Sequence, residues 1–147
     1  MKRIIDFELA HISSLVEMAL DLWKGSTYDD LKSMYEKIYF SHKEHVLLYE
    51  CEADFLAFIQ VSIRNDYVEG SHSSPVGYVE GIYVKQSHRG NKIAKELVAA
   101  GERWAATKGC NQMGSDIELH NDISYEFHKK IGFQEANRII CFIKDIK

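Results

Sequence analysis

The sequence predicts an α/β fold, with a mixed central β-sheet flanked by helices. Short apolar strands and segments with helical spacing of apolar residues alternate in the order β-α-α-β-β-β-α-β-α-β. No segment repeats, and a single Pro leaves no stretch that reads as a linker. The chain of 147 residues is long enough to bury one core, so we expect one domain over residues 1–147.

The first half of the chain supplies a strand, two helices and a hairpin. Residues 2–6 can form a strand, and apolar residues at helical spacing predict helices over residues 9–23 and 28–40. Residues 45–51 and 55–64 read as two strands joined by a turn at residues 52–54. In the second strand two sets of side chains alternate, Ile59, Val61 and Ile63 against Phe58, Gln60 and Ser62.

The second half begins with a polar loop over residues 65–75. A strong strand candidate follows at 76–84, then a turn at 85–90 and a helix over 91–108 that Lys108-Gly109 ends. Residues 111–116 are expected to form a short strand, residues 122–131 a helix, and residues 139–143 a last strand.

Composition argues against several functions. The formal charge is −4 and Lys and Arg form no block, so a nucleic acid is not the expected partner, whereas a cationic substrate would suit the charge. No apolar stretch is long enough to cross a membrane, and the first residues are not a signal peptide. Cys51, Cys110 and Cys141 are odd in number and far apart, and His42 with His45 lacks a third ligand. We therefore expect a reduced, cytoplasmic protein without a metal.

The strand at 76–84, its turn and the helix after it form the segment best suited to chemistry. A strand that enters a helix through a short turn offers free N–H groups and the positive end of the helix dipole to an anion. Arg89 can add a charge-assisted contact. The segment matches neither the dinucleotide nor the Walker pattern, so on these residues alone an ordinary strand-to-helix connection remains the alternative.

A wider resemblance narrows this choice. The run Arg89 to Ala94 resembles the pyrophosphate loop of GNAT acetyltransferases, and Asn121 to Phe133 is similar to the second signature of that family. Further stretches resemble the aminoglycoside 6'-N-acetyltransferases, and the likeness spans roughly residues 22–143. These stretches are Leu22-Trp23, Ser62 to Gly70, Ser74 to Val76, Glu80 to Ile82, Lys108 to Cys110 and Ser115-Asp116.

The resemblance implies the GNAT fold, whose central strands splay apart to hold acetyl-CoA without a metal. It places the cosubstrate on Ile82, Tyr83, Val84, Arg89, Gly90, Asn91, Lys92, Ile93, Ala94 and Asn121. Two residues depart from the wider family: Lys92 stands where the loop has Gly, and His128 where a general-acid Tyr is common. We expect Glu80, Ile82 and Val84 to share one strand face, with Gly81 letting the cosubstrate approach the backbone.

The resemblance also assigns the reacting groups. Asp116 would hold the amine and accept its proton, Glu80 would act similarly, and His128 would protonate the leaving thiolate. Trp23 and Tyr67 would contact the aminoglycoside. Structural alternatives stand beside these roles: an ion-paired strand residue for Glu80, a turn former for Asp116, a helix N-cap for Asn121, a packed histidine for His128 and a core anchor for Trp23.

The expected function is direct transfer of the acetyl group of acetyl-CoA to the 6'-amine of aminoglycoside antibiotics, which confers resistance. Two alternatives remain: a GNAT enzyme with another small amine or a protein amine as acceptor, and a CoA-binding module without turnover. By resemblance we also expect a homodimer.

Overall fold

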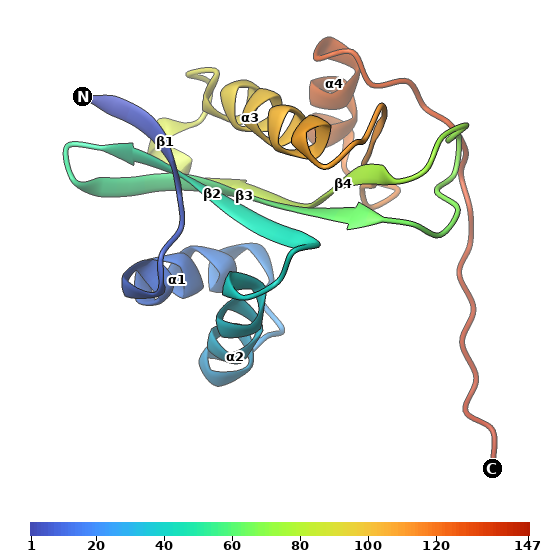
Figure 1. Ribbon diagram of the computed structural model, residues 1–147, viewed down its shortest axis with the longest axis horizontal. Helices are drawn as coiled ribbons and strands as arrows, with labels where there is room; N and C mark the ends of the chain where they lie inside the picture. Colours follow the sequence, from blue (N-terminus) through green and yellow to red (C-terminus); the bar gives the residue numbers. More distant parts are fainter.

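A computed structural model describes residues 1–147, and it confirms the predicted α/β class (Figure 1). Five strands lie in the order β1-β2-β3-β4-β5, antiparallel except for the parallel pair β4 and β5. The helices α1 and α2 cover one face of the sheet, and α3 and α4 lie on the other (Figure 1). The strands are β1 (Lys2–Asp6), β2 (Glu44–Cys51), β3 (Asp54–Arg64), β4 (Val76–Val84) and β5 (Met113–Gly114).

The helices agree with the sequence prediction within about three residues. They are α1 (Ile12–Leu22), α2 (Tyr28–Tyr39), α3 (Ile93–Thr107) and α4 (Asp122–Lys130), and short 3-10 turns η1 (Leu9–His11) and η2 (Gln86–His88) precede α1 and α3. Thr27 begins α2 by accepting a hydrogen bond from the N–H of Asp30, a standard N-cap. None of the helices is both long and apolar enough to cross a membrane.

Both faces of the central strands are buried, each in its own core. Leu48 and Phe58 pack against α1 and α2, whereas their neighbours in sequence, Leu47 and Ile59, pack with α3. This period of two is the one that a sheet covered on both faces requires. The alternation predicted along β3 is therefore confirmed, but it ends in two buried polar residues, Gln60 and Ser62.

A β-bulge interrupts β4 where the site begins. Gln60 pairs with Gly81 and Val61 pairs with Val79, so Glu80 is the extra residue in β4. Beyond it the alternation of side chains reverses. The expected shared face is therefore wrong: Ile82 packs toward α3, whereas Glu80 contacts Ser62 on the α1 face.

The strands β4 and β5 separate almost as soon as they meet. Only Gly77–Met113 and Tyr78–Gly114 are paired, although β4 continues to Val84. The strand expected over residues 111–116 is correspondingly reduced to Met113–Gly114, because the chain beyond it leaves the sheet. This divergence is the splay that the GNAT resemblance implied, and it leaves the far edge of β4 without a partner strand.

The strand predicted over residues 139–143 is absent. Residues 134–147, which we call the C-terminal arm, form no helix or strand and lead away from the body (Figure 1). Near its start, Asn137 donates to Glu69. The apolar side chains that suggested a strand are exposed, by 82% at Ile140 and 97% at Ile143. The segment is an apolar run, but it pairs with no strand of its own chain.

Candidate active site

Two predicted carboxylates flank the point where β4 and β5 separate. Glu80 and Asp116 each lie two residues beyond the last paired residues, Tyr78 and Gly114. Each therefore stands on one side of the opening gap. The structure thus brings together the two residues that the sequence assigned to the reacting amine.

Glu80 is held by two residues of β3. The guanidinium of Arg64 donates from Nη2 to both carboxylate oxygens at 3.0 Å and from Nε to one of them at 3.2 Å. The hydroxyl of Ser62 donates to the same carboxylate at 2.5 Å. Glu80 lies two residues beyond Tyr78, the partner of Ser62, so it shares the face that carries Ser62. The charge of Glu80 is accordingly compensated within the chain.

Asp116 has a different environment. It accepts a hydrogen bond of 2.5 Å from the hydroxyl of Tyr78, and no Lys, Arg or His side chain pairs with it. Burial and the bond to Asp116 both raise the pKa of Tyr78, so its hydroxyl remains a donor at neutral pH. Asp116 is exposed to solvent. It is the carboxylate of the gap whose charge is left for a ligand.

His128 reaches the same region from α4. Its Nδ1 lies 2.7 Å from the backbone oxygen of Ser124, which can only accept, so the ring proton is on Nδ1. Its Nε2 lies 2.8 Å from the hydroxyl of Ser115 and accepts from it when the ring is neutral. The rings of Phe127 and Phe133 pack against the imidazole. Ser115 therefore stands between His128 and the gap.

The turn before α3 presents a row of free donors. The backbone N–H groups of residues 90–95 donate to no acceptor in the chain. The positive end of the helix dipole points the same way. Gly90, with φ +86°, gives this turn its shape, and a side chain added there would meet no atom. The predicted anion site therefore has the donors that a diphosphate requires.

The two cationic residues of this turn, Arg89 and Lys92, lie in different surroundings. Arg89 folds back, donating from Nε to the carbonyl of Val84 at 2.8 Å, with its guanidinium 5.7 Å from the ring centroid of Tyr83. Lys92 is the N-cap of α3 and adopts φ 66° and ψ 10°. This left-handed conformation suits Gly, the residue that the loop of the wider family has at this position.

The remaining residues assigned to the cosubstrate differ in burial and in the hydrogen bonds they already make. Ile93, the first residue of α3, is buried in the core between α3 and the sheet, and Ala94 is half-buried, so these two residues offer a ligand mainly their backbone N–H groups. Asn91 donates to the carbonyl of His88. Asn121 caps α4 by accepting from the N–H of Ser124 at 3.1 Å, which is the structural role foreseen for it, and its amide N–H groups remain available.

Tyr83 and Gly81 are turned away from the cosubstrate. The hydroxyl of Tyr83 donates to Asp21 of α1. A Cβ on Gly81 would lie 2.6 Å from Cζ2 of Trp23. The expectation that Gly81 admits the cosubstrate is therefore wrong on this face, because the space belongs to an indole. Trp23 packs over β4 beside Glu80 and also contacts Phe58.

Tyr67 lies outside the body of the protein. Its side chain is 72% exposed in the loop before β4, where its hydroxyl accepts from the N–H of Gly70. The next residue, Val68, anchors this loop against Tyr78. Tyr67 is thus placed near the Asp116 side of the gap by its neighbour, with its ring free for a ligand.

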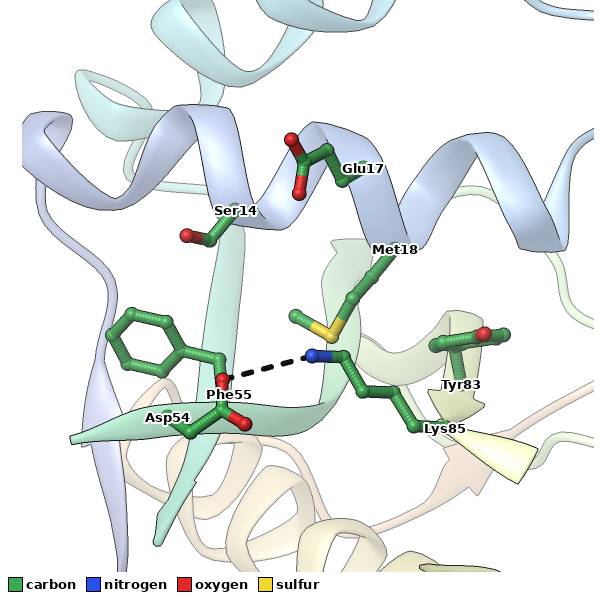
Figure 2. Close-up of a pocket in the computed structure, with 7 residues that line it drawn as sticks. All are labelled: Ser14, Glu17, Met18, Asp54, Phe55, Tyr83 and Lys85. Carbon is green, nitrogen blue, oxygen red and sulfur yellow. Dashed lines mark ion pairs between the residues drawn. The ribbon is translucent and has the colours of Figure 1, made fainter. Parts of the chain in front are cut away.

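A separate cavity of about 180 Å³ lies under α1 (Figure 2). Met18 and Phe55 line it, and Lys85 forms an ion pair with Asp54 at 3.7 Å across it. Tyr83 is the only predicted site residue at its wall. The cavity does not include the two carboxylates of the gap.

Three residues at the site were not assigned a role from the sequence: Arg64, Tyr78 and Ser115. Arg64 and Ser115 lie inside stretches that carry the resemblance, which was a usable signal. Tyr78 gave none, because an aromatic residue in a buried strand ordinarily belongs to the core. Its role becomes visible only through the bond to Asp116.

Comparison with known proteins gives consistent findings. The model of the acetyltransferase (GNAT) family matches residues 13–133. The aminoglycoside N(6')-acetyltransferase type 1 of Salmonella typhimurium is 38% identical over 91% of this chain and 92% of its own. The protein of the same name from Acinetobacter baumannii is 33% identical over 97% and 98%. The structure of AAC(6')-Iy with the bisubstrate analogue CoA-S-monomethyl-acetylneamine superposes with a TM-score of 0.96, at 34% identity over 99% of both chains.

Proposed function

The chain belongs to the GNAT acetyltransferase family, and on that premise we propose that it transfers the acetyl group of acetyl-CoA to the 6'-amine of aminoglycosides. The observation that carries this function is the pair of carboxylates at the divergence of β4 and β5, together with a turn of unpaired N–H groups at the end of β4. One feature suits a polycationic amine and the other suits a diphosphate. Residues 1–147 act as one N-acetyltransferase domain.

The cosubstrate fits the α3 side of the gap. The N–H groups of residues 90–95 would bind its diphosphate, and Lys92 adds a positive charge beside them. The pantetheine arm would run along the edge of β4 that β5 leaves free, toward Ile82. Free N–H groups on this edge supply hydrogen bonds to the thioester carbonyl. Asn121 offers its amide to the same arm.

The acceptor fits the α1 side. Asp116 binds the reacting ammonium, because its charge has no other cationic partner, and it accepts the proton directly or through water. Glu80 binds further polar groups of the sugar through water, since its own charge is paired with Arg64. Trp23 and Tyr67 provide aromatic surfaces on either side.

The proton for the leaving thiolate is supplied through Ser115. A protonated His128 would donate from Nε2 to the Ser115 oxygen, which turns the Ser115 hydroxyl toward the gap. The bond from Nδ1 to the Ser124 carbonyl keeps the ring in the orientation that this step needs. His128→Ala tests the role, and rates that match the wild-type rates at every pH would remove it.

An assay of CoA thiol release tests the whole function. Kanamycin and tobramycin should give release that depends on the aminoglycoside, and an analogue with a hydroxyl at the 6' position should give none. Asp116→Asn should lower kcat/KM by about 10²-fold, because the ammonium loses its anionic partner. Asp54→Asn, at the opposite end of β3, is the matched control and should leave kcat/KM unchanged. Release that is equal with and without every aminoglycoside rejects the assignment, and a wider amine panel identifies another acceptor.

We further propose that two copies form a homodimer through the C-terminal arm. Exposed apolar side chains, at Ile140, Phe142 and Ile143 among others, would each contribute about 1.5–3 kcal/mol if buried. The sheet ends at β5, whose outer edge has no partner and can accept a strand from a second copy.

Acetyl-CoA is a cytoplasmic metabolite, and all three cysteines are free, so the cytoplasm is the expected location.

Sedimentation velocity tests this association. Ile143→Glu should shift the protein toward the monomer, because a charge would enter the buried strand. Lys144→Glu, the next residue along the arm, should leave the dimer intact. A wild-type protein that sediments as a monomer at micromolar concentration contradicts the proposal.

A further inference from the structure

A continuous chain of contacts joins the two carboxylates of the gap. Glu80 is bonded to Arg64, the guanidinium carbon of Arg64 lies 3.5 Å from the ring centroid of Tyr78, and the hydroxyl of Tyr78 donates to Asp116. The contacts come from the end of β3, from β4 and from the residues after β5. The two carboxylates therefore do not sit at the gap independently.

The contacts compensate the negative charge of one carboxylate and leave that of the other uncompensated. Glu80 has the forked bond from Arg64 as well as the hydroxyl of Ser62, so its negative charge is matched by a cation in fixed geometry. Asp116 has only a neutral hydroxyl as its partner, and Tyr78 stays neutral because burial and Asp116 raise its pKa. A substrate ammonium entering the gap thus meets one uncompensated anion.

The middle of the chain of contacts is firmly held. Tyr78 is 6% exposed and packs with Val68 and Val76. Gly114 lies against the same ring, where a Cβ would come within 2.9 Å of it. Arg64 covers the remaining face of the ring. A guanidinium stacked on an aromatic ring loses less freedom when it also binds a carboxylate, because its plane is already fixed.

From these contacts we propose that Arg64 and Tyr78 are positioning residues that make Asp116 the single ammonium site of the reaction. Arg64 prevents Glu80 from competing for an ammonium group of the polyamine, and Tyr78 fixes the direction in which Asp116 is presented. Neither residue touches the reacting atoms. The inference rests on the proposed function, since it concerns how a polycationic acceptor is bound in one productive orientation.

The proposal makes an unusual kinetic prediction for Arg64→Met. Met fills a similar volume without charge, so Glu80 becomes a second uncompensated anion. Aminoglycosides carry several ammonium groups and would then bind in more than one way. We expect KM for the aminoglycoside and kcat each to fall about tenfold, because unproductive binding lowers the two constants by the same factor and leaves kcat/KM unchanged. KM for acetyl-CoA should not change.

Three further variants separate positioning from loss of structure. Arg64→Lys restores the charge but not the fork, and we expect it to return KM to the wild-type value and kcat to within about threefold. Tyr78→Phe removes the donor to Asp116 and should raise KM about fivefold. Arg3→Met breaks a comparable cross-strand pair, Arg3 with Glu50 at 2.9 Å, and should change neither constant.

Steady-state kinetics of CoA release with kanamycin, under saturating acetyl-CoA, decide the matter, with circular dichroism confirming that each variant is folded. A KM that rises in Arg64→Met, or constants equal to those of wild type, would overturn the proposal. So would an equal effect of Arg3→Met. If Arg64→Met does not fold, Arg64→Lys and Tyr78→Phe carry the test alone. A wild-type protein that releases no CoA with any aminoglycoside refutes the function itself, a result distinct from active enzyme with an indifferent Arg64.

Discussion

Replacing Lys92 with Gly should stabilise the protein. Lys92 holds φ 66° and ψ 10° at the N-cap of α3, a left-handed conformation that costs an L-residue about 1–2 kcal/mol. Gly adopts it without that cost but gives up about 0.5–1 kcal/mol through the greater freedom of the unfolded chain. The difference predicts a gain in unfolding free energy of about 0.5–1 kcal/mol for Lys92→Gly. The side chain of Lys92 is exposed, so little packing is lost.

Urea denaturation and thermal unfolding measure the gain, and a 1 kcal/mol change should raise Tm by about 2–4 °C in a chain of this size. Lys92→Ala is the matched variant, because it removes the same charge and keeps the strain, so its stability should stay within about 0.5 kcal/mol of wild type. Gly90→Ala should lose at least about 1 kcal/mol, since it places a Cβ at φ +86°. If Lys92→Gly is no more stable than Lys92→Ala, the reasoning from backbone strain is refuted.

The same two variants show what the ammonium of Lys92 does for the cosubstrate. Both lack the charge, and both keep the N–H groups that open α3. If the ammonium assists the diphosphate, the Kd for CoA should rise by about the same factor, on the order of threefold to tenfold, in both. Isothermal titration gives this value directly. Weaker binding by Lys92→Gly alone would mean that a rigid turn, and not the charge, serves the diphosphate.

Three further substitutions test contacts beneath the site. Tyr35→Phe removes a buried hydroxyl without a partner and should raise the unfolding free energy by about 1 kcal/mol at pH 7. Burial raises the pKa of Tyr35, so the native chain loses stability as pH rises above about 10. Urea titrations at pH 7 and above about pH 10 should therefore show a larger gain in unfolding free energy for Tyr35→Phe at the alkaline pH. Gly81→Ala forces Trp23 to move and should cost about 1–3 kcal/mol, with a higher KM for the aminoglycoside; a KM equal to wild type would detach Trp23 from the acceptor site. The hydrogen bond from Tyr83 lowers the pKa of Asp21, and Lys24 lowers it further. Tyr83→Phe should therefore destabilise the protein at pH 7, and by less as pH falls below about 4, where that bond no longer favours the folded state. A loss of unfolding free energy that does not depend on pH would contradict this.

The order of elements followed from the sequence because most of the sheet is buried on both faces. In β3 and β4 alternate apolar residues pack into the two cores, and each of the helices α1 and α3 buries one apolar face. Predictions were wrong where the partner of a segment could not be inferred. Residues 111–116 read as a strand, but only Met113–Gly114 has β4 beside it. Residues 139–143 have the composition of a strand but pair with no strand of their own chain.

The sequence named Glu80, Asp116 and the turn before α3 for the site, and the structure puts the two carboxylates just beyond the last paired residues of β4 and β5. Their surroundings were not predictable by spacing. Arg64 is 16 residues from Glu80, and Tyr78 is 38 from Asp116. Such pairs depend on the register of strands. A register can be drawn from the hydrophobic pattern only while that pattern is unbroken.

The bulge at Glu80 explains why regular alternation fails where the chemistry is concentrated. Without the extra residue, Ile82 and Val84 would share the α1 face with Tyr78 and Glu80, and Tyr83 would face α3. Insertion of one residue reverses the alternation after Glu80, so Glu80 stays on the face of Arg64 while Ile82 and Val84 enter the α3 core. A bulge also bends its strand, and this one lies two residues beyond the point where β5 stops pairing, so it coincides with the opening of the gap. A local departure from the β-period, paired with a polar residue in an otherwise apolar strand, is therefore the sequence feature most closely tied to this site.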